Sequence, residues 1–288
     1  MRALARNAMR RFHVFVGLAT SLALGGGEGG RLMAQVSYRE VQVVGGGAIR
    51  GTVRLGGDIP AMARLSVTKD EKYCGTTKKS SRLVVGKSGG VMNAIVWLEG
   101  VKEGKKRARN PQFVLDQSGC EYVPHVLLLP SGAVLDIVNN DPILHNVHTY
   151  DGERGRKTLF NIAQPFKGQR TTVKQATFSR PGVYLTTCDA GHPWMSAYII
   201  VTGHPYFAIT NAGGEFTLDD IPPGSYTLKM WHEGVTVVKE ELEHGTPKAY
   251  VYEAPYEQEK KVTVTANGRE DVNFVFEVRP LPLATFSK

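Results

Sequence analysis

The chain lacks any apolar run long enough to cross a bilayer. Its longest such stretch, residues 12–25, has 14 residues, whereas a spanning helix needs about 20. Four arginines at positions 2–11 precede this stretch, and the small residue Ala34 follows it in Leu32-Met33-Ala34. This order is typical of an export signal. We therefore expect residues 1–34 to be a cleaved signal peptide rather than a retained membrane anchor, and the mature protein to be exported.

The chain also lacks a large excess of one charge once that segment is set aside. Residues 1–34 contain five arginines and one glutamate, so the remainder holds 30 basic and 26 acidic residues. A balance of this kind gives little general attraction for a phosphate backbone. The composition therefore argues against a nucleic-acid partner.

Cysteine is scarce, with three residues in the chain. An exported protein favours disulfides, and an odd number leaves one thiol that needs a separate explanation. Cys74 and Cys120 both lie beside turn-forming residues and are the natural pair. Their bond would close a loop of about 45 residues and contribute about 4 kcal/mol in the chain-entropy model. Cys188 is then left over, and it is the cysteine that has histidine and methionine nearby.

Sustained helical periodicity is absent as well, which favours an all-β fold. Short β-rich segments alternate with turn residues from Gln35 onward. The composition changes near residues 203–205, so we expect a first domain at 35–202 and a smaller C-terminal β-sandwich at 203–288. The charged segment 240–260 has no clear alternation and is expected to be a loop.

The most informative stretch is Tyr184–Met195, which reads Y-L-T-T-C-D-A-G-H-P-W-M. It contains a thiol at Cys188, an imidazole at His192 and a thioether at Met195. These donor types favour copper, and two imidazoles with one thiolate and a weak thioether define the blue, type-1 copper site. A second imidazole must come from elsewhere in the chain, and His145 is the best candidate.

Other histidines leave alternatives open. His125 is the chief rival of His145 for the second imidazole. His148 lies three positions after His145, so on a strand it would face the opposite side, as a surface polar residue or as a support for the ligands. His204, His232 and His244 have no donor residues nearby and are expected at the surface or between domains.

Two motifs carry a resemblance to a known family. The segment 139–148 reads N-N-D-P-I-L-H-N-V-H, and its Asn-Asn and His-Asn-Val resemble the plastocyanins. Gly182, Tyr184 and Cys188 match the family's approach to its cysteine ligand, and His-Pro-Trp-Met at 192–195 is similar to the corresponding segment of amicyanins. Residues 139–201 thus resemble the cupredoxins.

This resemblance implies a Greek-key β-barrel or sandwich that binds one type-1 copper ion through His145, Cys188, His192 and Met195. The loop departs from amicyanin by one additional residue before the histidine. Its spacing equals the second half of a binuclear copper-A loop, but that site would need a cysteine where Tyr184 stands. A mononuclear site is therefore expected.

Residues 203–279 resemble the carboxypeptidase-regulatory-like, or transthyretin-like, β-sandwich. The similarity lies in F-A-I-T at 207–210, G-E-F-T-L at 214–218 and P-G-S-Y-T-L at 223–228. This module occurs in proteins of many kinds, so it says little about function.

Together the resemblances imply an exported protein of the bacterial envelope, located in the periplasm, that carries single electrons. They also imply that its partner is a cytochrome c or a membrane redox complex. His192 is expected to present its ring edge to solvent, Asn146 to help tie the ligand loops, and Trp194 to form a docking patch or to pack on the second domain. The sequence reveals no general base, nucleophile pair or open coordination position, so we expect no enzymatic activity.

Three other functions stay open. The chain could be a copper carrier or storage protein, or a non-redox structural or binding subunit of an envelope complex. It could also be an enzyme with a type-2 copper or zinc site built from His125, His145 and His148. Nothing in the sequence determines the oligomeric state.

Overall fold

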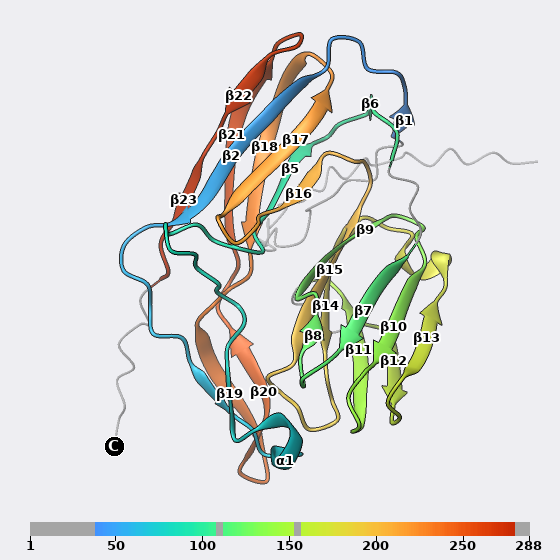
Figure 1. The fold of residues 1–288 in the computed structure, drawn as a ribbon, viewed down its shortest axis with the longest axis vertical. Helices are drawn as coiled ribbons and strands as arrows, with labels where there is room; N and C mark the ends of the chain where they lie inside the picture. Colours follow the sequence, from blue (N-terminus) through green and yellow to red (C-terminus); the bar gives the residue numbers. More distant parts are fainter. Residues whose placement is uncertain (1–37, 108–111, 153–156, 280–288) are drawn as a thin grey trace, which may run out of the picture. The chain divides into compact units, whose positions relative to one another are not determined.

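The computed structural model describes residues 38–107, 112–152 and 157–279, and these residues form an almost entirely β structure, as predicted. The strands of this described part make two sandwiches of two sheets each and three small two-stranded sheets (Figure 1). None of its helices is long and apolar enough to span a membrane. The expected signal peptide, residues 1–34, lies outside the described residues.

The first sandwich occupies residues 113–202. One sheet has the order β13-β10-β7-β8, with the bounds Gln169–Val173, Leu135–Asn139, Phe113–Gln117 and Tyr122–Val123. The other has the order β12-β11-β14-β15-β9, with the bounds Lys157–Gln164, His145–Asp151, Gly182–Thr187, Ser196–Thr202 and Val126–Pro130. A short helix, η1 (Gln175–Phe178), lies between β13 and β14 in the chain. Leu115, Ile137 and Ile199 are fully buried in the core between the two sheets.

The second sandwich has a mainly apolar core, in which the His232 ring is also buried, 5.2 Å from the Phe276 ring. One sheet has the order β16-β5-β18-β21, with the bounds Phe207–Ile209, Ile95–Glu99, Gly224–His232 and Tyr256–Val264. The other has the order β17-β2-β22, with β23 also beside β2, and the bounds are Glu215–Ile221, Gly47–Leu55, Arg269–Asp271 and Phe274–Phe276. Ile49, Leu98 and Phe274 are fully buried between these sheets.

The strand pairing does not follow the expected linear division at residue 203. β2 pairs with β17, and β5 lies between β16 and β18, so two strands from the first half of the chain complete the C-terminal sandwich. The expected domain 35–202 therefore includes strands of both sandwiches. Turn and strand signals are local, whereas the choice of a pairing partner depends on packing between distant segments, which explains the difference.

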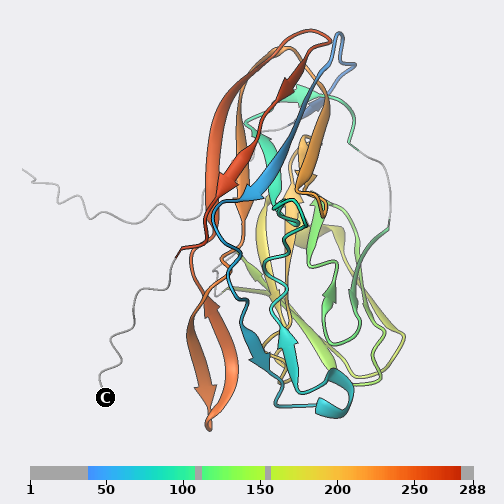
Figure 2. The same ribbon diagram turned by 60° about the vertical axis from the view of Figure 1, so that its left-hand side comes forward.

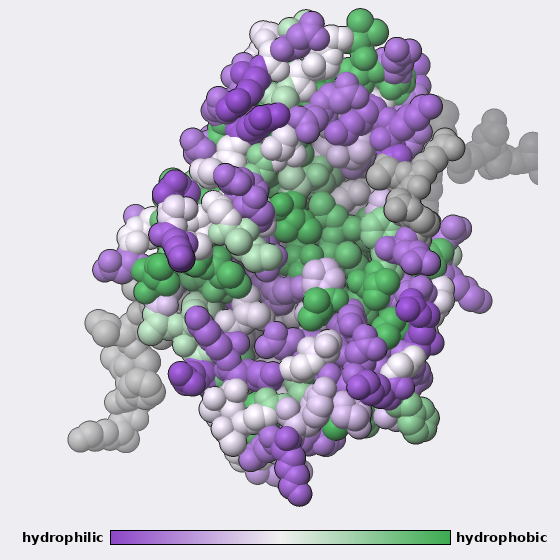
Figure 3. Space-filling view, in the orientation of Figure 1, coloured by the Kyte–Doolittle hydropathy of each residue, from purple (hydrophilic) through white to green (hydrophobic). Residues whose placement is uncertain are grey.

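Two strands, β5 and β15, are buried on both faces. Ile95 and Trp97 of β5 pack in one cluster with Tyr198 and Ile200 of β15, and their alternate neighbours belong to the cores of the two sandwiches. The unbroken apolar runs in these segments are the sequence signal of doubly buried strands. Hydrophobic side chains also gather on the surface around β16 (Figure 3).

A hairpin occupies most of the segment that was expected to be a loop. β19 (Val237–Glu243) and β20 (Thr246–Tyr252) pair in antiparallel register around His244-Gly245, which both have positive φ. Val237 and Tyr250 pack against the core of the first sandwich. The prediction was wrong because the exposed positions of the hairpin are so rich in charge that the alternation is hidden. A further small sheet pairs β1 (Arg39–Glu40) with β6 (Glu103–Gly104).

A short helical segment lies at one end of the first sandwich. It connects β3 (Arg64–Ser66) to β4 (Thr77–Lys79) and contains α1 (Glu71–Cys74) (Figures 1 and 2). The predicted disulfide between Cys74 and Cys120 is present, and it ties α1 to the turn between β7 and β8. Cys188 is free and buried, as its proposed role as a ligand requires.

Candidate metal centre

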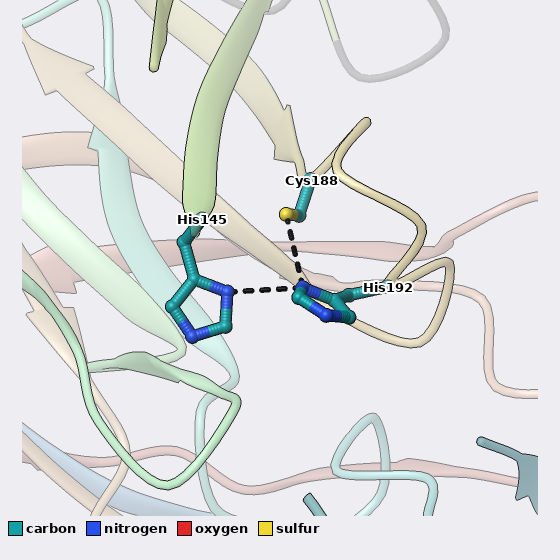
Figure 4. A group of neighbouring side chains, drawn as sticks. All are labelled: His145, Cys188 and His192. Atoms are coloured by element: carbon teal, nitrogen blue, oxygen red, sulfur yellow. Dashed lines mark hydrogen bonds between the residues drawn. The ribbon is translucent and has the colours of Figure 1, made fainter. Parts of the chain in front are cut away.

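Three of the four expected ligand residues converge in the first sandwich. The Nδ1 atoms of His145 and His192 lie 3.0 Å apart, and the Cys188 Sγ lies 3.6 Å from the His192 Nδ1 (Figure 4). The three donor atoms all lie within 4.8 Å of one another. Both imidazoles are fully buried, and Cys188 is 4% exposed.

The sheet register explains why these residues meet. β11 and β14 are antiparallel neighbours in which His148 pairs with Thr187. His145 begins β11 and Cys188 directly follows β14. Because the two strands are antiparallel, both residues lie at the same end of this strand pair. The loop then turns back at Gly191, whose φ of +92° is readily adopted by glycine. His192 is brought beside Cys188 by this turn.

The far nitrogen of each imidazole contacts a carboxylate. The His145 Nε2 lies 2.8 Å from the Asp141 Oδ2, and the His192 Nε2 lies 2.9 Å from the Asp70 Oδ2. An ionised carboxylate can only accept hydrogen bonds, so each Nε2 carries the ring proton. Both Nδ1 atoms then present lone pairs to the centre.

The donor set fits a metal ion. Bonds of about 2.0 to 2.3 Å, at angles between tetrahedral and trigonal, separate ligand atoms by about 3.3 to 3.7 Å. The separations of 3.0 and 3.6 Å between the donors lie close to this range. The two imidazole lone pairs and the sulfur atom face one point, and a bound cation that displaced the thiol proton would satisfy all three.

Burial also favours the protonation states that metal binding needs at the imidazoles. Burial lowers the pKa of His145 and of His192, although Asp141 and Asp70 partly oppose the shift. Both rings are therefore neutral at neutral pH, which is the ligand form. Burial raises the pKa of the Cys188 thiol, while the N–H of Asn146 opposes it. The thiol must lose its proton to a bound metal, so binding releases a proton.

Asn146 links the two ligand loops, as expected. Its backbone N–H points at the Cys188 Sγ at 3.5 Å, and its Oδ1 accepts a hydrogen bond from the Asp189 N–H at 2.5 Å. The Tyr122 hydroxyl lies within hydrogen-bond distance of the carbonyl oxygens of Asn146 on β11 and Thr187 on β14. These contacts fix the position of the thiol relative to His145.

Met195 and Trp194 are both buried in the core of the first sandwich with Cys188. The backbone N–H of Met195 donates to the His192 carbonyl at 2.9 Å, which closes the ligand loop. Its role as a weak ligand stays a prediction. Trp194 donates from Nε1 to the Cys120 carbonyl at 3.0 Å. Because Trp194 is buried, it forms no surface patch, and that expectation was wrong. Its packing on the second domain stays a prediction.

The rival histidines have other partners. His125 contacts the buried carboxylate of Glu233 through Nε2, and His148 contacts Asp189 and Thr158. Among the described residues, neither belongs to a group of three or more donors that could hold an ion. The type-2 site considered for His125, His145 and His148 therefore has no support in the geometry.

Comparisons with known proteins find structural similarity over about one third of the chain. No family model and no curated protein matches it. Among solved structures, a purple cupredoxin from Nitrosopumilus maritimus is 26% identical over 32% of this chain and 100% of its own, with a TM-score of 0.27. An amicyanin from Paracoccus versutus is 20% identical over 34% of this chain and 86% of its own, with a TM-score of 0.27.

An enzyme also appears among these structures. The copper-containing nitrite reductase NirK from Thermus scotoductus SA-01 is 25% identical over 34% of this chain, with a TM-score of 0.28, and the match spans 24% of the reductase. Two of the three structures named here are cupredoxins, and the third is a larger copper-containing enzyme of which the match covers one part. Their TM-scores are too low to add to the geometry described above.

The expectation for the exposure of His192 was also wrong. His192 does not present its ring edge to solvent, because the ring is fully buried and Asp70 covers its Nε2. Sequence reasoning also missed Asp70 and Asp141 as partners of the imidazoles. Asp141 lies within the recognised 139–148 motif and could have been found there. Asp70 is 122 residues from His192, and nothing local in the sequence marks it.

Proposed function

We propose that this chain is an exported type-1 copper protein that carries single electrons between redox partners. The observation that carries the proposal is the buried convergence of two Nδ1 atoms and one free thiol on a single point. Imidazole and thiolate donors of this kind are typical of blue copper sites. Cys188 also stays out of any disulfide, although an exported protein meets oxidising conditions. A bound metal best explains this free thiol.

The chain's own residues would perform the function by holding a fixed geometry. His145 and His192 would bind through Nδ1, Cys188 as a thiolate, and Met195 as a weak thioether. Bound copper supplies one-electron redox chemistry at this point. The antiparallel pairing of β11 with β14 and the contacts of Asn146 restrain the ligand loops, and burial excludes water. Little would need to rearrange when an electron arrives or leaves.

The remaining parts of the proposal concern context. The protein would be periplasmic, and its partner would be a cytochrome c or a membrane redox complex. We propose no enzymatic activity for it. The second sandwich would be a module of the carboxypeptidase-regulatory-like kind that supports the copper domain through β5, β18 and the cluster they share with β15.

Spectroscopy of the copper-loaded protein tests this proposal. We expect one copper per chain, an intense visible band from thiolate-to-copper charge transfer, and a type-1 electron paramagnetic resonance signal. Cys188→Ser should abolish the band. His148→Gln is the matched control, since His148 lies on the same strand as His145 but outside the donor group, and it should keep the band. A colourless protein that is replete with copper would refute the proposal.

A second candidate function is the storage or delivery of Cu(I). The complete burial of His192 favours it, because no ligand edge is open to a redox partner. Electron self-exchange separates the two candidates. A reversible couple with measurable self-exchange supports the electron carrier, whereas a site that retains Cu(I) and resists oxidation supports storage.

A further inference from the structure

A short segment covers the metal centre from outside the sandwich. We call residues 69–75 the cap. The Lys69 Nζ donates to the Ala190 carbonyl at 2.7 Å, Asp70 contacts the Nε2 of His192, and Cys74 is bonded to Cys120. The cap thus reaches the ligand loop at two places and is covalently tied to the sandwich at a third.

The cap also reaches the other imidazole through Asp141. The Tyr73 hydroxyl donates to the Asp141 Oδ1 at 2.8 Å. The backbone N–H groups of Gly119 and Cys120 donate to the two carboxylate oxygens at 2.8 and 2.7 Å. Asp141 is 1% exposed and is held by these donors in the orientation that meets the His145 Nε2. A carboxylate therefore stands behind each ring, and the one behind His145 is itself held by a network of donors.

We propose that Asp70 and Asp141 are positioning residues of the metal centre, which hold the two imidazoles in their ligand tautomer and favour the Cu(II) form. The proposal rests on the proposed copper function. Asp70 belongs to the cap and Asp141 to the sandwich, so the centre is completed by a segment more than 100 residues away from its ligand loop.

The physical reason is the charge on the far side of each ring. A carboxylate that accepts the Nε2–H makes the imidazole a stronger donor at Nδ1. A stronger donor stabilises the more highly charged ion, so Cu(II) gains more than Cu(I). The same contacts restrict ring rotation, and this keeps both Nδ1 atoms directed at the Cys188 sulfur.

Asp70→Asn is the decisive variant, and Glu71→Gln is its matched control. Both remove one negative charge from adjacent positions of the cap, but only Asp70 contacts a ring, and Glu71 is exposed. We expect Asp70→Asn to lower the affinity for Cu(II) about 10- to 100-fold with a smaller effect on Cu(I). Each tenfold loss confined to Cu(II) raises the reduction potential by about 59 mV. Glu71→Gln should change neither quantity appreciably.

A measurement without copper makes the test independent of the redox function. Long-range ¹H–¹⁵N spectra of the metal-free protein report which ring nitrogen is protonated. We expect Nε2–H at His192 in the wild type and in Glu71→Gln, and a mixture of tautomers in Asp70→Asn. Asp141→Asn would leave a carboxamide facing four donors, so it is a poor test because it threatens the fold itself. Tyr73→Phe is therefore the variant to use for Asp141, because it removes one of these donors from an exposed position. We expect it to shift the reduction potential less than Asp70→Asn does.

The outcomes separate the two proposals. A wild-type protein without a blue band, whose His192 tautomer still depends on Asp70, would reject the copper function and keep the positioning role. Equal potentials and equal ring spectra for Asp70→Asn and Glu71→Gln would overturn the positioning role, even if the wild type is a blue copper protein.

Discussion

The two sandwiches solve the same packing problem with different side chains. The second fills its core with residues such as Leu228, Met230 and Phe274, all fully buried. The first buries a set of polar residues at the edge that carries the ligands, namely Gln117, Asn139, Asp141, His145, Asn146, Gln164 and His192. Polar groups of this kind persist in a core only when hydrogen bonds satisfy them.

The polar set of the first sandwich is a connected network. The Asn139 amide donates to the carbonyls of Ile143 and Gln164 at 2.9 and 2.8 Å, and its Oδ1 accepts from the Asp141 N–H. Asp141 in turn meets His145. The difference teaches that the first sandwich uses buried polarity to orient a site, whereas the second contributes stability mainly through apolar packing and buries fewer polar groups, such as His232 and Glu233 at the end of β18.

The largest expected effect is a loss of folding stability, without a change at the metal centre, when the apolar core of the second sandwich is mutated. Phe274→Ala removes a fully buried ring of β23 and should lower the free energy of unfolding by about 3 to 5 kcal/mol. The visible spectrum of the copper-loaded protein should not change. The adjacent Val275, 53% exposed, supplies the control, because Val275→Ala should cost less than about 0.5 kcal/mol. Denaturant unfolding and absorption spectra check both statements; an altered copper band in Phe274→Ala would contradict the division of roles.

A smaller effect is expected from pH at the connection between the sandwiches. The His204 ring lies 4.8 Å from the Phe207 ring, and burial lowers the pKa of His204 to about 4. The unfolded chain takes up a proton near pH 6.5, whereas the folded chain does so only near pH 4. The contribution of neutral His204 to the free energy of unfolding is therefore fully present above about pH 6.5 and is lost as the pH falls toward 4. At pH 5 the loss is about 2 kcal/mol.

Unfolding of the metal-free protein at pH 7.5 and pH 5 measures this effect. His204→Gln should reduce the difference between the two pH values, and His244→Gln, in the exposed turn of the β19–β20 hairpin, should leave it unchanged. The buried histidines of the metal centre are present in both variants and contribute equally. The same pH dependence in all three proteins would show that His204 does not titrate as the structure implies.

The smallest effect compares two asparagines in corresponding roles. Asn146 in the first sandwich accepts from the Asp189 N–H, and Asn273 in the second accepts from the N–H and hydroxyl of Thr52 at 2.9 Å. Either change to alanine should cost about 1 kcal/mol of stability. Only Asn146→Ala should shift the charge-transfer band, since only its contact fixes the cysteine loop. A band shift in Asn273→Ala would weaken the contrast between the sandwiches.

Part of this structure could be predicted from the sequence because its signals are local. Cys188 and His192 lie four residues apart in a single loop, and His145 lies in a compact motif of its own. The disulfide followed from the count of cysteines and the proximity of Cys188 to other donors. In each case the chemistry of neighbouring residues carried the inference.

The rest depends on contacts between distant segments. Asp70 meets His192 only because β3, α1 and the disulfide place it there, and no spacing in the sequence encodes that approach. The assignment of β2 and β5 to the second sandwich depends on which partner buries their apolar faces best. The charged β19–β20 hairpin is a strand pair because Val237 and Tyr250 pack on a neighbouring sheet, not because of its own pattern.

The cap would control how the proposed copper site acquires its ion. All three donor residues lie at 4% exposure or below, and the Cys74–Cys120 bond holds the cap over them. An ion that approaches past His192 has to displace Asp70 and the turn around it. In the proposed copper protein, an ion would therefore enter either before the disulfide closes the cap or when the cap opens. Once closed over an ion, the centre would release it to chelators only as fast as the cap opens.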